Sequence, residues 1–262
     1  MESLENRVII VAGGAGGIGN ATARLLVDQG VIVIVVSRKN TAMDSLIGEL
    51  KTLSPRSSAF QGDLGQSRTW QRLVDFAQRE YRRIDGLVNC VGLLNTKNLE
   101  NLVPHEIESV IGANFLSVVF GVQAVLPMMR RQGQGHIITL GSLGGIVPMP
   151  FASLYCATKH AVRGFSLSLS EELRGTGISV SLLSLGPVHT KMLDAEALND
   201  QAVIAFINIP LHPESVAETV ASLLRQPQRE LILPRTTGMF SLLCNCSPGL
   251  FGMLYRVLQP LG

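Results

Sequence analysis

One serine, one tyrosine and one lysine have the types and spacing needed for proton transfer. Tyr155 follows Ser142 by thirteen residues, and Lys159 follows Tyr155 by four. Residues four apart lie on one face of a helix, about one turn from each other. An ammonium at that distance favours the phenolate and lowers the tyrosine pKa from its ordinary value of about 10. The pair could then act as a general acid and base near neutral pH, with Ser142 bonded to the reacting oxygen.

The Tyr–Lys spacing is also compatible with ordinary packing, because a half-buried tyrosine and a solvated lysine occur four apart on helices by chance. The elements around the pair decide between the two interpretations. They must bring a cofactor and a substrate to this position.

The first forty residues contain a turn that could hold such a cofactor. An apolar run at residues 8–12 leads into G-G-A-G-G-I-G at residues 13–19, a helical pattern follows, and a second apolar run spans residues 31–36. This order is typical of a βαβ unit, in which glycines let backbone N–H groups approach a pyrophosphate at the helix N-terminus. A glycine-rich turn can be only a tight connection, but this context favours dinucleotide binding.

Ser37 and Arg38 end the second strand, where the choice between NAD and NADP is usually made. An acidic residue there would accept a hydrogen bond from the 2′-hydroxyl of NAD. A guanidinium pairs instead with the 2′-phosphate of NADP. The sequence therefore favours NADP, with NAD as the alternative and a plain surface arginine as the structural interpretation of Arg38.

The rest of the chain continues the alternation of strands and helices. Further apolar runs near residues 58–61, 84–92, 136–140 and 178–184 make six strands, and a helix near 213–226 precedes a short strand, E-L-I-L-P. This pattern predicts an α/β fold with a single doubly wound parallel sheet, Rossmann-type, in one domain over residues 1–262. Ligands bind outside the carboxyl ends of such strands, so Ser142 should lie at the same edge as the glycine turn.

Asn114 lies in an otherwise apolar run, I-G-A-N-F-L-S-V-V-F. A buried amide must find hydrogen-bond partners. Two interpretations stay open: a structural asparagine that kinks a helix, and a member of a proton relay.

Several motifs follow one another in a fixed order. They are Gly13-x-x-x-Gly17-Ile18-Gly19, Asp63, N-C-V-G at residues 89–92, Asn114, Ser142, Tyr155-x-x-x-Lys159 and L-G-P-V-H-T at residues 185–190. With these motifs the chain resembles the short-chain dehydrogenase/reductase family over nearly its whole length. The resemblance implies a catalytic tetrad of Asn114, Ser142, Tyr155 and Lys159. It also implies a cofactor site that includes Tyr155 and Lys159 together with Asp63 and Leu64 near the adenine, Asn89 steadying a strand, and Val188 and Thr190 at the nicotinamide amide.

Four places depart from the family pattern. Ala12 replaces a threonine under the glycine turn, Cys90 and Val91 replace an Asn-Ala pair, and Leu185 replaces a proline. Gly16 is uncharged where many NADP users carry a second basic residue. None of these changes touches the tetrad.

The expected reaction is hydride transfer between a nicotinamide and a carbonyl or alcohol carbon, with Tyr155 protonating the oxyanion in the reductive direction. The alternatives are an NAD-linked alcohol dehydrogenase and a non-catalytic protein that senses NADP(H). The complete tetrad argues against a sensor, which has no need of Tyr155 and Lys159 together.

Composition and the first residues bear on three further questions: nucleic-acid partners, metal sites and the location of the protein in the cell. The net charge is +2 with scattered basic residues, so nothing indicates a nucleic-acid partner. The four cysteines form no C-x-x-C pair, which leaves no expectation of a metal site. The opening M-E-S-L-E-N-R lacks the pattern of a signal peptide, so we expect a cytoplasmic protein.

Two segments after Thr190 concern the substrate. Residues 191–210 are expected to form a lid whose Met192, Leu193, Leu198 and Phe206 line an apolar pocket, although ordinary helix packing explains them equally well. Residues 236–262 form an apolar tail, and its first twenty residues carry no charge.

The tail is long enough to span a bilayer, but polar residues, a proline and glycines interrupt it. Covering a substrate site, lying on a membrane surface, or packing in a subunit interface are the three roles left open. We expect a lipophilic carbonyl or alcohol substrate, peripheral membrane contact through the tail, and a homo-oligomer, either dimer or tetramer.

Overall fold

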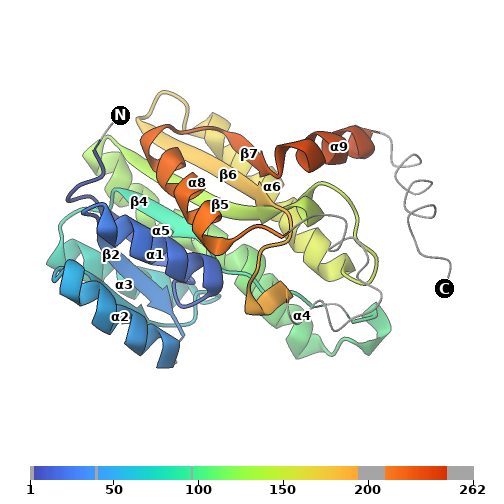
Figure 1. The fold of residues 1–262 in the computed structure, drawn as a ribbon, viewed down its shortest axis with the longest axis horizontal. Helices are drawn as coiled ribbons and strands as arrows, with labels where there is room; N and C mark the ends of the chain where they lie inside the picture. Colours follow the sequence, from blue (N-terminus) through green and yellow to red (C-terminus); the bar gives the residue numbers. More distant parts are fainter. Residues whose placement is uncertain (1–2, 39–40, 96, 194–209, 247–262) are drawn as a thin grey trace.

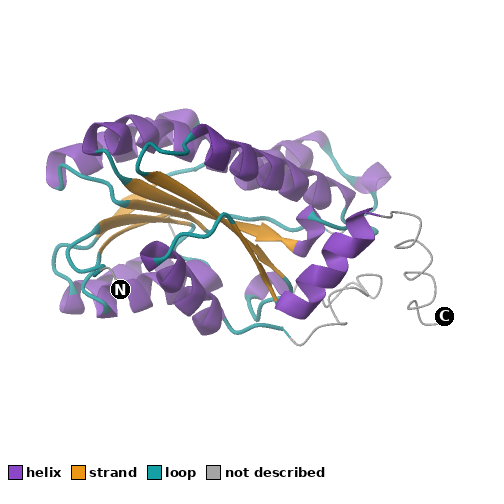
Figure 2. Ribbon diagram, turned by 90° about the horizontal axis from the view of Figure 1, so that it is seen from above, coloured by secondary structure: helices purple, strands orange, loops and turns teal. Residues whose placement is uncertain are grey.

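The computed structural model describes residues 3–38, 41–95, 97–193 and 210–246. Within them, seven parallel strands form one sheet in the order β3-β2-β1-β4-β5-β6-β7, and helices cover both of its faces (Figure 1, Figure 2). The predicted doubly wound sheet is confirmed.

The strands are short and follow the predicted apolar runs. They are β1 (Val8–Ala12), β2 (Ile32–Ser37), β3 (Ser58–Gln61), β4 (Gly86–Asn89), β5 (Gly135–Ser142), β6 (Ile178–Leu185) and β7 (Glu230–Leu233). Every residue of β1 and β4 is buried, as expected for central parallel strands covered on both faces.

The helices lie between successive strands, except α9, which follows the last strand. They are α1 (Gly17–Asp28), α2 (Thr41–Leu53), α3 (Ser67–Glu80), α4 (Pro104–Ile111), α5 (Ser117–Gln132), α6 (Ser153–Glu172), α8 (Pro213–Arg225) and α9 (Arg235–Cys246). Two short 3-10 helices, η1 (Leu99–Asn101) and η3 (Leu143–Gly145), and one π-helical turn, η2 (Gly112–Leu116), complete the described elements.

Two apolar clusters hold the helices on the sheet. Residues of α3, α5 and α6, among them Trp70, Val122 and Val162, pack on one face with alternate residues of the strands. Residues of α1, α2 and α8, among them Leu26 and Leu46, pack on the other face. Apolar side chains therefore cover both faces of the sheet. Polar functional groups are left to the ends of its strands.

The strand order reverses between β1 and β4, because β1 pairs with β2 on one side and with β4 on the other. The connections after these two strands leave toward opposite sides of the sheet, which opens a crevice at their carboxyl ends. The glycine turn follows β1, and β5 next to β4 ends at Ser142. Both predicted parts of the site therefore lie at one edge.

The short strand predicted at E-L-I-L-P is confirmed as β7, which pairs with β6 and is the seventh strand of the sheet. The π-helical turn η2 contains Asn114 and separates α4 from α5.

The helical stretch Pro104–Gln132 contains an 18-residue window with a mean hydropathy of 1.8, which is long and apolar enough to cross a membrane by length and composition alone. Val118, Val122, Val125 and Met129 of this stretch are buried in the cluster that holds it on the sheet. Core packing accounts for these four side chains, and 39% of the apolar window is buried in all.

Candidate active site

Glycines in the turn let backbone atoms and the Thr190 side chain come close to the N-terminus of α1. Gly13 has a φ of 79°, and its N–H donates to the carbonyl of Val36 over 2.8 Å. A Cβ atom at Gly19 would lie 2.4 Å from the Gly13 carbonyl oxygen, and one at Gly17 would lie 2.7 Å from Thr190 Cγ2. The turn therefore fits the close approach of a phosphate group to free helix N–H groups.

The second predicted part of a cofactor site adjoins this turn. Ser37, Arg38, Asp63 and Leu64 line one cavity together with Gly13. The Arg38 side chain is exposed, and the Asp63 carboxylate accepts a hydrogen bond from the Gly65 N–H over 3.0 Å. The structure thus brings the residues expected near adenine and ribose into one cleft.

Asn89 and Val188 occupy structural positions at the same edge. The Asn89 side chain donates to Thr139 Oγ1 over 3.2 Å, which ties the end of β4 to β5. Val188 forms an isolated parallel bridge with Leu211, and Thr190 Oγ1 donates to the Val188 carbonyl over 3.3 Å. Ile18, Val188 and Thr190 also line the pocket that contains Tyr155.

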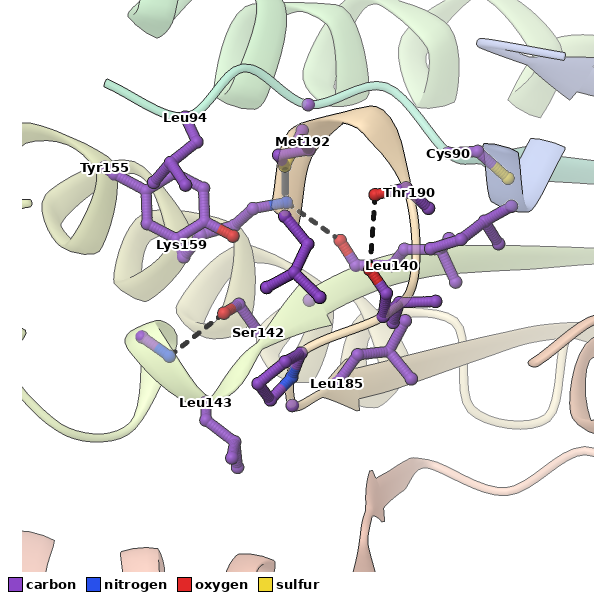
Figure 3. A pocket seen from close by; sticks show the side chains of 18 of the residues that line it. Cys90, Leu94, Leu140, Ser142, Leu143, Tyr155, Lys159, Leu185, Thr190 and Met192 are labelled. Carbon is purple, nitrogen blue, oxygen red and sulfur yellow. Dashed lines mark hydrogen bonds between the residues drawn. The ribbon is translucent and has the colours of Figure 1, made fainter. Parts of the chain in front are cut away.

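Ser142, Tyr155 and Lys159 lie in this pocket (Figure 3). Ser142 is the last residue of β5, and its Oγ accepts a hydrogen bond from the Gly144 N–H over 3.0 Å. Helix α6 presents Tyr155 and Lys159, with Lys159 Nζ 5.8 Å from the centre of the Tyr155 ring. The spacing in sequence has placed an ammonium beside a phenol.

Burial dominates the electrostatics of Lys159. Its side chain is 5% exposed, and Nζ donates to the Leu140 carbonyl over 3.1 Å. Desolvation lowers the pKa of Lys159 to about 8, although the nearby Cys90 opposes this shift. At pH 7 the side chain still carries its charge, in a dry environment where that charge acts strongly on its neighbours.

Asn114 is completely buried in the π-helical turn η2. Its Oδ1 accepts from the Leu93 N–H over 2.6 Å, and its Nδ2 donates to the Leu93 carbonyl over 2.9 Å and to Thr158 Oγ1 over 3.0 Å. These bonds satisfy the amide and fasten the segment after β4 to the helix. The structural role is therefore visible in the contacts, while the proton relay stays a prediction.

Thr158 is a site residue that the sequence analysis did not single out. It is 4% exposed, accepts from Asn114, and donates to the Tyr155 carbonyl over 2.7 Å. It thus links Asn114 to the backbone of the residue that carries the phenol. The sequence does show a hydroxyl residue immediately before Lys159. Its position alone does not reveal that the hydroxyl bonds Asn114 and the Tyr155 carbonyl.

Cys90 lies close enough to Lys159 for the two groups to influence each other. Burial raises the pKa of the Cys90 thiol to about 12, although the positive charge of Lys159 opposes that rise. The thiol is therefore neutral at physiological pH and is a poor nucleophile.

The remaining wall of the pocket is apolar. Its side chains include Leu94, Leu143, Met149, Leu185, Met192 and Leu193. Figure 3 shows Met192 extending toward Lys159, and a Cβ atom at Gly92 would lie 3.7 Å from Met192 Cε and 3.8 Å from Lys159 Nζ. Of the predicted lid residues, Met192 and Leu193 line the pocket, whereas Leu198 and Phe206 lie outside the described residues.

The family model described as short chain dehydrogenase matches residues 7–201 of the chain, which include the glycine turn and the Ser–Tyr–Lys pocket. The chain belongs to the short-chain dehydrogenase/reductase family. It is therefore an oxidoreductase that acts on CH–OH and C=O groups with a nicotinamide cofactor.

Two curated relatives match this short-chain dehydrogenase over most of their length. A 3-oxoacyl-[acyl-carrier-protein] reductase of Synechocystis is 30% identical over 239 residues, covering 90% of this chain and 96% of the relative. An uncharacterised oxidoreductase of Staphylococcus saprophyticus is 29% identical over 236 residues, covering 88% and 95%.

A solved structure with a related sequence is that of an actinorhodin polyketide ketoreductase variant with NADPH. It superimposes with a TM-score of 0.80 at 28% identity, covering 89% of this chain and 97% of the other.

The charge of Lys159 is expected to cost folding stability. Because its pKa in the folded protein, about 8, is below its unfolded value of 10.5, the penalty is full below pH 8 and is relieved as pH rises toward 10.5. Lys159→Met should abolish turnover yet raise the free energy of unfolding at pH 7 by about 2 kcal/mol, allowing for the lost bond to Leu140.

Thermal unfolding from pH 7 to 10.5 measures both effects. Wild type should gain stability across that range relative to Lys159→Met, and the exposed Lys51→Met variant serves as control. A Lys159→Met protein that unfolds several degrees below wild type at pH 7 would contradict a desolvation cost.

The Thr158 hydroxyl is expected to position Tyr155. Thr158→Val should lower kcat about fivefold to thirtyfold through loss of one or two buried hydrogen bonds and should shift the pH profile of kcat, while Thr158→Ser should restore both. Thr22→Val is the matched control, because Thr22 is fully buried and its Oγ1 has no hydrogen-bond partner among the described residues. Equal effects of the valine and serine variants would rule out the positioning role.

Proposed function

We propose that this chain is an NADP-dependent oxidoreductase that transfers a hydride between nicotinamide and the carbonyl or alcohol carbon of a lipophilic small molecule. One observation carries the proposal: the pocket that holds Ser142, Tyr155 and Lys159 has an otherwise largely apolar wall and reaches Ile18 in the glycine turn. The cofactor, when bound, supplies or accepts the hydride.

The residues of the pocket have distinct proposed roles. Tyr155 gives its phenolic proton to the substrate oxygen in the reductive direction, and Ser142 holds that oxygen with its hydroxyl. The Lys159 ammonium favours the phenolate that remains, and its dry surroundings strengthen that effect. Asn114 is proposed to hold a water that returns a proton from bulk, since its Oδ1 keeps one lone pair beyond the bond to Leu93.

The preference for NADP rests on Ser37 and Arg38 at the end of β2. Both line the cavity next to the glycine turn. The residue before Arg38 is a serine and not an aspartate or glutamate, so no carboxylate at position 37 would repel a 2′-phosphate. A guanidinium there pairs with a 2′-phosphate. The similar polyketide ketoreductase structure contains NADPH, which supports this choice. NAD use is the second candidate, because Gly16 gives the turn no additional positive charge.

The lipophilic substrate follows from the pocket wall. Leu94, Met149, Met192 and Leu193 offer dispersion contacts and no charged partner. We further propose one catalytic domain over residues 1–262 with residues 191–210 as its lid, and a cytoplasmic homo-oligomer, either a dimer or a tetramer.

Tyr155→Phe tests the catalytic assignment. A general acid contributes about a hundredfold to ten-thousandfold, so kcat should fall by at least about a hundredfold while NADPH binds as in wild type. A panel of lipophilic carbonyls and alcohols, followed by NADPH or NADH absorbance, finds the substrate for this measurement. Tyr81→Phe is the control, since Tyr81 lies at the end of α3. Activity within tenfold of wild type would remove Tyr155 from its role.

Arg38→Asp tests the cofactor preference. Loss of a charge-assisted pair with a 2′-phosphate should raise the Kd of NADPH by about tenfold to a hundredfold and leave NADH binding unchanged or improved. The fluorescence of the bound dinucleotides measures both constants. Arg131→Asp at the end of α5 is the control for a change of net charge. A wild type that binds NADH more tightly than NADPH would refute the preference.

A further inference from the structure

Helix α9 has an apolar face that is exposed in the described part of the chain. Met239, Phe240, Leu242 and Leu243 are 69%, 47%, 37% and 66% exposed. Their positions place them on one side of the helix. Figure 1 shows α9 extending outward from the end of β7, away from the helices that cover the sheet. Exposure of four neighbouring large apolar side chains indicates a surface that contacts something else.

The opposite face of α9 is anchored beside the active site. Gly238, Ser241 and Cys244 are its buried residues. Cys244 packs in a cluster with Leu143, Ile146 and Val147, and a Cβ atom at Gly238 would lie 2.6 Å from Ile232 Cγ2. Leu143 follows Ser142 directly and also lines the pocket. The apolar face therefore lies about one helix diameter, roughly 10 Å, from the pocket wall.

We propose that α9 docks this enzyme on the surface of a lipid bilayer, lying in the plane of the interface with Met239, Phe240, Leu242 and Leu243 among the acyl chains. Asn245, Ser247 and Pro248 interrupt the uncharged stretch 236–255, which disfavours a helix that crosses the bilayer. An exposed apolar face on one side of a helix is suited to lie on the bilayer surface.

The charge pattern around α9 favours lipid, and anionic lipid in particular. No aspartate or glutamate follows Glu230 in the sequence, and Arg235 and Arg256 bound the uncharged residues 236–255. The sixteen residues after Cys246 carry one charge, that of Arg256, and they include further large apolar residues such as Leu250, Phe251 and Leu254. An apolar segment bounded by arginines matches a membrane of acyl chains beneath anionic headgroups.

A second copy of the chain is a weaker candidate for the same face. Among the described residues the face consists of four large apolar side chains, whereas a stable interface takes about 20–30 residues and buries about 800 Å² on each partner. Lipid acyl chains need no shape complementarity, so a patch of this size is sufficient for them.

The position of α9 also indicates a substrate class for the proposed reaction. This step rests on the proposed function. Docking through α9 would hold the Leu143 side of the apolar pocket close to the bilayer surface. The substrate class is then a carbonyl or alcohol compound that partitions into membranes and reaches the pocket from the lipid.

Co-sedimentation of the full chain with phosphatidylcholine vesicles, with and without phosphatidylglycerol, tests the docking. Wild type should bind the vesicles that contain phosphatidylglycerol, and Phe240→Asp/Leu243→Asp should bind at least tenfold more weakly. The control is Leu53→Asp/Leu99→Asp, which alters two leucines that are 62% and 61% exposed on α2 and η1. Absence of binding by wild type, or equal binding by the α9 variant, would overturn the proposal.

Two further measurements keep the test decisive. Phe240→Trp should show a blue shift and quenching by brominated lipids, against a constant signal from Trp70, which is fully buried. Leu99→Trp should show neither. Sedimentation velocity without vesicles identifies the other occupant: a dimer that dissociates on Phe240→Asp/Leu243→Asp, with no vesicle binding by wild type, would assign the face to a second copy.

Failure of docking and failure of the proposed function give different results. Vesicle binding is measured without turnover, and the α9 variant should keep the kcat/KM of wild type for a water-soluble carbonyl compound. For a substrate presented in vesicles its rate should fall at least fivefold. Loss of activity with both forms of substrate, in a variant that unfolds at the wild-type temperature, would contradict the docking role.

Discussion

The ammonium of Lys159 is a charge held inside a dry protein, and the arrangement of the site follows from that constraint. A buried cation must be given partners, and the Leu140 carbonyl near the end of β5 is one of them. The same strand continues two residues further to Ser142, so the bond that compensates the charge also sets the distance between Lys159 and the serine. The apolar wall that excludes water from Tyr155 keeps the ammonium effective.

Close backbone contacts give this arrangement its rigidity. A Cβ atom at Gly145 would lie 2.6 Å from the Lys159 carbonyl oxygen, so η3 packs directly on the backbone of α6. At the other end of the site, Gly19 allows the same approach between α1 and Gly13. Contacts between backbone atoms have fewer rotatable bonds than contacts between long side chains. Small residues therefore fix Ser142, Tyr155 and the helix N-terminus relative to one another.

The sequence was sufficient to predict the parts of the molecule that depend on local periodicity. The apolar runs gave the parallel sheet, and the order of the motifs placed Ser142 and the glycine turn at one edge. The π-helical turn at Asn114 could not be derived, because its partners, Leu93 and Thr158, are 21 and 44 residues away. Helix α9 was not predicted either, since its sequence has no charged residue after Arg235 and lacks the alternation of polar and apolar residues that marks a surface helix. Its exposed face carries Met239, Phe240, Leu242 and Leu243, whereas the exposed face of a surface helix normally carries polar side chains.

Cys90 shows how a departure from the family pattern can leave the chemistry intact. An asparagine is usual there, and its amide oxygen is a stronger hydrogen-bond acceptor than a thiol. Burial keeps the Cys90 thiol neutral, since it raises the pKa to about 12, and a thiol is only a weak hydrogen-bond acceptor. Lys159 has three N–H donors, and Leu140 takes one of them among the described residues. A neutral thiol at this position therefore competes only weakly for the other two donors, and Lys159 keeps its charge at pH 7.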